Sequence, residues 1–279
     1  MKKNRLCILL SCSLLCLSAC TANQSTSTTT SVSETTIAEK KSDADFIVGV
    51  GKGLEKRWEL AGKGDAMSDE EFDKLTLSEY KELYKSYVDA ELNEIGNLDG
   101  YQFENSDLND LANDYMNCLQ LQKNSVDSFT EKSTNNSPEW NYGYQKRIVD
   151  LSELFNNYGL TVSETYTDTK NEMTDTNLPY AKKYVAIIDW LTNLNETINF
   201  EEVSNDSSWK EYKALVENTT DYDITYITIN IDLLDESGVT VEQQTCYLNN
   251  LTPGGKYYAT FSSDKAFTSM KVTPRVNFQ

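Results

Sequence analysis

The residue types of this chain limit the acid–base and nucleophilic catalysis that it could carry out. The 279 residues include no histidine, which excludes Ser-His-Asp and Cys-His catalysis, His-ligated zinc and HExxH metal sites. Carboxylates are plentiful, at 44 Asp+Glu against 25 Lys+Arg, but pairs such as Glu70-Glu71 and Glu201-Glu202 are better explained as solvated faces and helix-start charges. A glycosidase needs two carboxylates at a set separation in a cleft, and positions along a chain do not reveal such a pair. The sequence therefore predicts no catalytic residue, and we expect a protein that is not an enzyme.

Two kinds of short motif suggest ligand binding, and neither has the full spacing of a known site. The run Gly49-Val50-Gly51-Lys52-Gly53 lacks the GxxxxGK[ST] spacing of a phosphate loop, follows no apolar strand and lies inside a helical repeat. Asn205-Asp206 and Asp221-Tyr222-Asp223 leave weak calcium binding open, although no EF-hand loop is present. A net charge of −19 and a pI near 4.4 argue against nucleic acid as a partner. We predict no cofactor and no metal site.

The first twenty residues contain an export signal. Basic residues at Lys2, Lys3 and Arg5 precede an apolar run of about a dozen residues, which is too short to span ~30 Å of hydrocarbon. The sequence Leu17-Ser18-Ala19-Cys20 resembles the lipobox of bacterial lipoproteins. This resemblance implies cleavage before Cys20, a diacylglycerol thioether on its sulfur and a firm membrane anchor. Two acyl chains bind a protein stably to the membrane, whereas one chain gives only marginal, reversible binding. An ordinary signal peptide with a chance cysteine is the alternative.

The residues after Cys20 have the composition of a tether. Eleven of the 21 residues from 21 to 41 are Ser or Thr without an apolar period, which is typical of disorder. Cleavage after residue 19 would leave 22 basic and 44 acidic residues, a charge of −22. The remaining cysteines, Cys118 and Cys246, fall on a predicted helix and a predicted strand, and we expect both to be free, buried thiols.

Residues 43–197 have the apolar repeat of four or five amphipathic helices, which we expect to pack as a bundle. The repeats are Phe46–Trp58, Tyr80–Ile95, Leu108–Leu119, Tyr144–Tyr158 and Tyr184–Leu194. Capping boxes begin at Ser68 and Thr76, Ser137-Pro138 opens a helix, and Gly159 suits its left-handed end. Glycines inside the first helix predict a kink or close packing. The Tyr-rich stripes are expected to form core rather than a ligand groove, which is the alternative.

Residues 198–279 change to a period of two. Ile227, Ile229, Ile231 and Leu233 alternate with more polar residues, and turn clusters recur every 8–12 residues, which indicates an antiparallel β-sandwich. The sequences Val216–Thr220, Ile231–Asp235 with Gly238, and Leu251-Thr252-Pro253-Gly254 resemble the FxLYD domain. This resemblance implies a small immunoglobulin-like sandwich of the bacterial envelope. Ile231 and Leu234 stand where the family has Phe and Tyr, and Asp235 and Gly238 are expected to form a turn.

The sequence as a whole predicts a multidomain chain with helices first and strands last. The expected parts are a signal peptide (1–19), lipidated Cys20 with its tether (20–42), a helical domain (43–197) and an FxLYD-like domain (198–279). The Phe46–Trp58 pattern and the acidic helices after it resemble uncharacterised lipoproteins of low-GC Gram-positive bacteria, from which no functional residue carries over. We expect a lipoprotein held by Cys20 on the outer face of the cell membrane that binds a protein or wall partner. A carboxylate hydrolase and a structural or stress-related envelope component are the alternatives.

Overall fold

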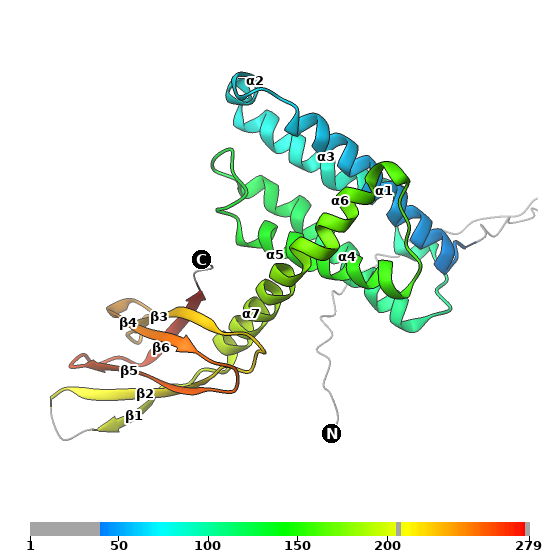
Figure 1. Ribbon diagram of the computed structural model, residues 1–279. Coiled ribbons are helices and arrows are strands. Elements are labelled where there is room, and N and C mark those ends of the chain that lie inside the picture. The colour runs from blue at the N-terminus through cyan, green and yellow to red at the C-terminus, as the bar shows by residue number, and fades with distance from the viewer. Residues whose placement is uncertain (1–39, 205–207, 277–279) are drawn as a thin grey trace, which may run out of the picture. The chain divides into compact units, whose positions relative to one another are not determined.

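A computed structural model describes residues 40–204 and 208–276, in which helices come first and antiparallel sheets follow (Figure 1). The predicted signal peptide, Cys20, most of the tether, Asn205-Asp206 and the end of the last strand lie outside the described residues. The helices are α1 (Asp43–Asp65), α2 (Asp69–Lys74), α3 (Leu77–Ile95), α4 (Ser106–Ser125), α5 (Pro138–Asn157), α6 (Thr167–Asn171) and α7 (Leu178–Thr197). The strands are β1 (Glu201–Ser204), β2 (Lys210–Glu217), β3 (Ile224–Leu234), β4 (Thr240–Leu251), β5 (Lys256–Ser263) and β6 (Ser269–Val276).

Local capping residues set where the first helices begin. The side chains of Ser42, Ser68 and Thr76 each accept a hydrogen bond from the backbone N–H three residues on, and the acidic side chain at that position accepts one from the backbone N–H of the cap residue. Each box satisfies two backbone groups that would otherwise lack partners at a helix start. The predicted capping boxes at Ser68 and Thr76 are confirmed, and Ser42 forms a third one at the start of α1.

Helix α5 also begins and ends where the sequence predicts. The Ser137 hydroxyl accepts from the Trp140 amide, and Pro138 occupies the first turn. Gly159 has φ +70°, the left-handed conformation predicted for it, and the Leu160 amide donates to the Leu154 carbonyl at 3.1 Å. The stretch after it, which has no apolar period, forms helix α6 and a π-helical turn (Glu172–Asn177) that leads into α7.

The glycines of α1 mark close packing rather than a break in the helix. A Cβ on Gly51 would lie 2.8 Å from the Thr161 carbonyl oxygen, and one on Gly53 would lie 2.8 Å from the Glu91 Cα. Helix α1 therefore runs uninterrupted while the backbone of α3 approaches it closely. Of the two outcomes predicted for these glycines, close packing is the one found.

The strands form two three-stranded antiparallel sheets, with orders β1-β2-β5 and β4-β3-β6. In the second sheet, Ile229 of β3 lies opposite Cys246 of β4 and Pro274 of β6. The alternate residues Ile227, Ile229, Ile231 and Leu233 are fully buried, as predicted. Ile224, which the alternation places on the outer face, is also buried, because the two-residue period is interrupted before Ile227.

Helix α7 contributes to two hydrophobic cores. Ala181, near its start, packs in the core of the helical region with Phe46 and Tyr115. Its second half packs instead against strands of both sheets, through Ile187, Trp190, Leu191 and Leu194. The Trp190 indole Nε1 donates to the Glu217 carbonyl oxygen at 2.9 Å and anchors this half to the end of β2.

The two cysteines of the described region are free and buried, as predicted. Burial raises the pKa of the Cys118 thiol to about 12 and that of Cys246 to about 11. Since the thiolate is the reactive form, we expect neither residue to react with iodoacetamide at pH 8 until the chain is unfolded in urea. Peptide mass spectrometry reads each site, with Ser237→Cys in the exposed β3–β4 turn as a reactive control. Alkylation of Cys118 as fast as the control would contradict the prediction.

Candidate functional site

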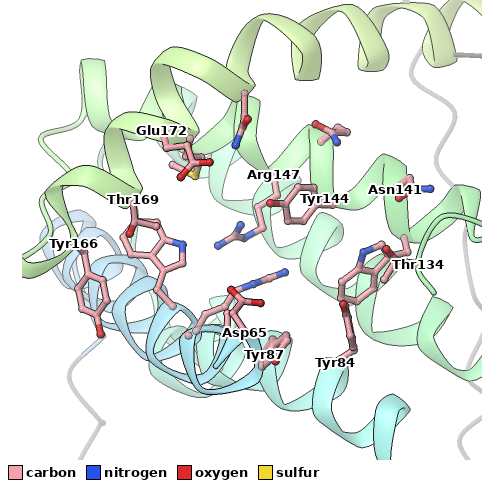
Figure 2. A pocket seen from close by; sticks show the side chains of 18 of the residues that line it. Asp65, Tyr84, Tyr87, Thr134, Asn141, Tyr144, Arg147, Tyr166, Thr169 and Glu172 are labelled. Atoms are coloured by element: carbon pink, nitrogen blue, oxygen red, sulfur yellow. The ribbon is translucent and has the colours of Figure 1, made fainter. Parts of the chain in front are cut away.

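The helical region contains an open pocket with a volume of about 750 Å³ (Figure 2). Its walls come from α1, α3, α5 and the segment from Thr165 to Asn177, together with Thr134 of the loop before α5. The volume falls in the range of sites for small molecules, which is roughly 300–1,000 Å³. The segment around Glu172, where the sequence predicts no regular element, supplies one wall of this pocket.

Aromatic side chains line much of this pocket. Tyr84 of α3 lies with its ring centroid 5.4 Å from that of Tyr87 and 5.2 Å from that of Trp140. On another side, the ring of Trp58 lies 5.6 Å from that of Tyr166. Each pair holds its rings in fixed, tilted or edge-on geometry, so the walls are preformed. Tyr80 of α3 is buried in the core, as expected for the Tyr stripe, whereas Tyr84 and Tyr87 of the same stripe also line the pocket.

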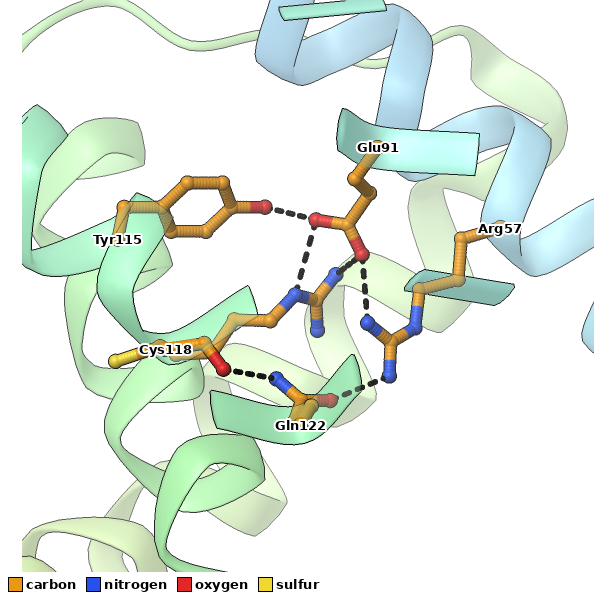
Figure 3. A network of polar contacts seen from close by, with 6 residues as sticks. Arg57, Glu91, Tyr115, Cys118 and Gln122 are labelled. Carbon is orange, nitrogen blue, oxygen red and sulfur yellow. Dashed lines mark hydrogen bonds and ion pairs between the residues drawn. The ribbon is translucent and has the colours of Figure 1, made fainter. Parts of the chain in front are cut away.

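Two arginines lie at the inner end of the pocket and share one buried carboxylate, that of Glu91 (Figure 3). Arg57 donates from Nη1 to Glu91 Oε1 at 2.8 Å, and Arg147 donates from Nε to Oε2 at 3.0 Å. The Tyr115 hydroxyl donates to the same Oε2. Glu91 is fully buried, and the two arginines are 5% or less exposed. A carboxylate buried this deeply keeps its charge only with such partners.

Gln122 completes the network on the side of α4. Its Oε1 accepts from Arg57 Nη2 at 2.9 Å, and its Nε2 donates to the Cys118 carbonyl at 3.3 Å. Together these contacts join side chains of α1, α3, α4 and α5 in the middle of the helical region (Figure 3). The network therefore fixes the position of the arginines before any ligand arrives, which is the arrangement that a binding site requires.

The network carries one positive charge more than it neutralises, because two guanidinium groups face the single carboxylate of Glu91. Burial alone raises the pKa of Glu91, but the two arginines and the Tyr115 hydroxyl outweigh it and hold that pKa below 4.5. Burial, followed by repulsion from Arg147, lowers the pKa of Arg57. The guanidinium of Arg147 points into the pocket (Figure 2).

Two buried polar atoms in the pocket lining have no hydrogen-bond partner among the residues that the structure describes. Arg147 Nη2 lies 2.6 Å from Glu91 Oε1 as an ion pair, but its N–H groups are not aligned for a hydrogen bond. Gln145 Oε1 is the second such atom. An unpaired buried acceptor costs about 1–3 kcal/mol, so a ligand group that donated to Gln145 Oε1 would gain correspondingly. The exposed carboxylates of Asp65 and Glu172 lie at other points of the lining.

The sequence alone predicts no functional role for the three charged residues of the network, Arg57, Glu91 and Arg147. A usable signal was present, since Glu91 lies four residues after Tyr87 and four before Ile95, on the apolar stripe of α3. Arg147 occupies a similar position on α5, four residues before Leu151. A charged residue on an apolar stripe predicts a buried partner of opposite charge. The single predicted site residue, Cys20, lies outside the described residues.

Other candidate chemistry is sparse in residues 40–204 and 208–276. No group of three or more Cys, Asp or Glu residues there is placed to hold a metal ion, and Asp221 and Asp223 are both exposed. No helix in this part of the chain is long and apolar enough to cross a membrane. In a second cluster, Asp150 contacts Lys146 and the Cys118 thiol beside a pocket of about 280 Å³, and burial raises the pKa of that thiol to about 12, so the sulfur is protonated at neutral pH. No protein-family model, curated protein or solved structure matches this chain.

Proposed function

We propose that this protein is a lipoprotein, anchored by Cys20 on the outer face of the cell membrane, that binds a small ligand in the pocket of its helical region. The observation that carries the binding role is the pair of preorganised, buried arginines, which carry one positive charge in excess of Glu91, in a pocket that is partly lined by aromatic side chains. A pocket that combines aromatic side chains with a few fixed polar groups is typical of ligand sites. The anchor rests on the likeness of Leu17–Cys20 to a lipobox.

We also infer a specific architecture for each half of the described chain, namely that the helices form a bundle and that the strands form an FxLYD-like, immunoglobulin-like sandwich. Support comes from residues of both sheets that share one core, such as Val216 of β2 and Ile229 of β3, and from Gly238, which has φ +76° in the turn after Asp235.

The lipid anchor has a direct test. Replacing Cys20 by serine removes the sulfur that carries the acyl chains, so labelling of the protein by radioactive palmitate should be lost and the protein should leave the membrane fraction. Cys246→Ser, which changes a buried thiol of β4, serves as the control and should keep both the label and the location. Palmitate label that persists in the Cys20→Ser protein would overturn the anchor.

Binding in the pocket is tested by truncating one exposed wall residue. Tyr144 is 37% exposed and lines the pocket, whereas Tyr180 is 48% exposed on α7 and does not. The full chain, purified in mild detergent, is incubated with the small-molecule fraction of an envelope extract and examined by native mass spectrometry. We expect an added mass on the wild type and on Tyr180→Ala, and loss of most of it in Tyr144→Ala. Equal retention by both variants, or no retained mass, would contradict the proposal.

A carboxylate hydrolase is the second candidate, because Asp65 and Glu172 both line the pocket. Hydrolysis would require two carboxylates that flank the scissile bond. Turnover of an extract component that stops in both Asp65→Asn and Glu172→Gln would favour this candidate. Retention of an unchanged molecule favours the binding protein.

A further inference from the structure

We infer that the pocket takes a zwitterionic ligand of the amino-acid or short-peptide class, with its carboxylate on Arg147 and its nitrogen end toward the acidic and amide oxygens of the lining. This inference rests on the proposed binding function and specifies its ligand. Figure 2 shows the elements of the argument, with Arg147 directed into the cavity and Asp65 and Glu172 on either side of it.

The carboxylate end follows from the charge at the inner end of the pocket. Arg57 and Arg147 share the single carboxylate of Glu91, so one buried positive charge has no counter-ion in the network. Arg147 is 2% exposed, and its planar fork is held against Glu91 by its Nε hydrogen bond and by the ion pair of its Nη2. A ligand carboxylate supplies the missing counter-charge, in the planar geometry that guanidinium groups bind best.

The nitrogen end follows from the other lining groups. Gln145 Oε1 is a buried acceptor without a donor among the described residues, and an ammonium or peptide N–H would satisfy it. The carboxylates of Asp65 and Glu172 make the outer lining negative, which favours a cation there. These two charges would repel a phosphate dianion, and a neutral sugar would leave the guanidinium of Arg147 without a counter-charge. The lining therefore offers a cation, Arg147, for the carboxylate end of the ligand, and two carboxylates, Asp65 and Glu172, for its ammonium end. A zwitterion matches both.

The middle of the ligand is specified by the aromatic walls. Trp58 and Tyr166 line one side, and Tyr84, Trp140 and Tyr144 line another. Rings fixed in these positions bury flat or apolar surface at little cost in side-chain entropy. A ring-bearing side chain, such as that of phenylalanine, fits this lining better than a short polar one.

Isothermal titration with a matched series of probes tests this inference on the full chain in mild detergent. The probes are L-phenylalanine, Ala-Phe and Ala-Ala-Phe, which vary the separation of the two charged ends, together with the C-terminal amide and the N-acetyl derivative of the tightest binder. We expect that amidation and acetylation each weaken binding by about tenfold or more, since each removes a charge-assisted hydrogen bond. Arg147 itself is left unchanged because its replacement would disturb the buried network.

A variant of the lining identifies where the nitrogen end binds. Asp65→Asn should weaken binding of the free peptide and reduce the penalty for N-acetylation, whereas Asp69→Asn, an exposed change on α2 outside the pocket, should alter neither. Binding of the amide or the acetyl form as tightly as the free peptide would overturn the inference. If no probe binds but Tyr144→Ala still abolishes retention of an extract molecule, the ligand class is wrong and the binding function stands. If both experiments are negative, both proposals fail.

Discussion

The Glu91→Gln variant is expected to lose about 3–5 kcal/mol of its free energy of unfolding, which is the usual cost of removing one partner from a buried ion pair. Glu91 is fully buried and accepts from Arg57, Arg147 and Tyr115. Its neutral replacement leaves two guanidinium groups buried without a counter-charge. Urea unfolding followed by circular dichroism measures the change.

Glu94 offers a matched control one turn further along α3. Its carboxylate pairs with Lys56, but that lysine is 58% exposed, so water screens the pair. Glu94→Gln should change stability by about 1 kcal/mol or less, as surface ion pairs do. Similar losses in the two variants would show that the Glu91 network adds little to stability. In a double-mutant cycle, Glu91→Gln and Arg147→Gln together should cost less than the sum of the single changes, because they remove the same interaction.

The loss of stability in Glu91→Gln should depend on pH in a direction that the structure defines. The pKa of Glu91 in the folded chain lies below its ordinary 4.5, because the attraction of the arginines outweighs burial. A carboxyl group with a lowered folded-state pKa contributes stability above pH 4.5 and loses that contribution as the pH falls through the folded value. The stability difference between wild type and Glu91→Gln should therefore be full at pH 7 and shrink as the pH falls below 4.5. A difference that grows on acidification would contradict this assignment.

Regular elements with local signals were predictable from the sequence, and the pocket was not. Ser68, Thr76 and Ser137 carry their caps within three residues, and the apolar repeats of α3 and α5 need only local periodicity. The segment from Glu164 to Asn177 has no such period, and only contacts with distant helices define its 3₁₀, α and π turns. Since this segment forms one wall of the pocket, no local pattern could predict the cavity.

The arginines of the site show a second limit of sequence reasoning. The positions of Arg57 and Glu91 on apolar stripes indicate that each is buried, but the two lie 34 residues apart and on different helices. Pairing them requires knowing that α1 and α3 pack against each other. The glycines of α1 indicate that another element packs closely against this helix, because glycine has no side chain to keep a neighbouring backbone away. They do not indicate which element that is. The structure supplies the partner, since Gly53 faces the Cα of Glu91 itself.

Gly53→Ala should therefore destabilise the protein, although alanine is the better helix former. The added Cβ would lie 2.8 Å from the Glu91 Cα, and because the obstacle is backbone, α1 and α3 must move apart. Overpacking of this kind costs about 1–3 kcal/mol. The shift would also displace Glu91 from Arg57, so we expect a loss at the upper end of that range.

Gly62→Ala on the same helix is the matched opposite case. No described atom lies within 4 Å of the position that its Cβ would take, and Gly62 is exposed inside α1. Here helix propensity and the reduced entropy of the unfolded chain decide the result, and alanine should stabilise the protein by about 0.5–1 kcal/mol. Thermal unfolding of the two variants and the wild type, measured in parallel, shows whether each change destabilises or stabilises the protein. If Gly53→Ala were stabilising like Gly62→Ala, the close approach of α1 to α3 would be wrong, and so would the geometry that places both arginines on Glu91.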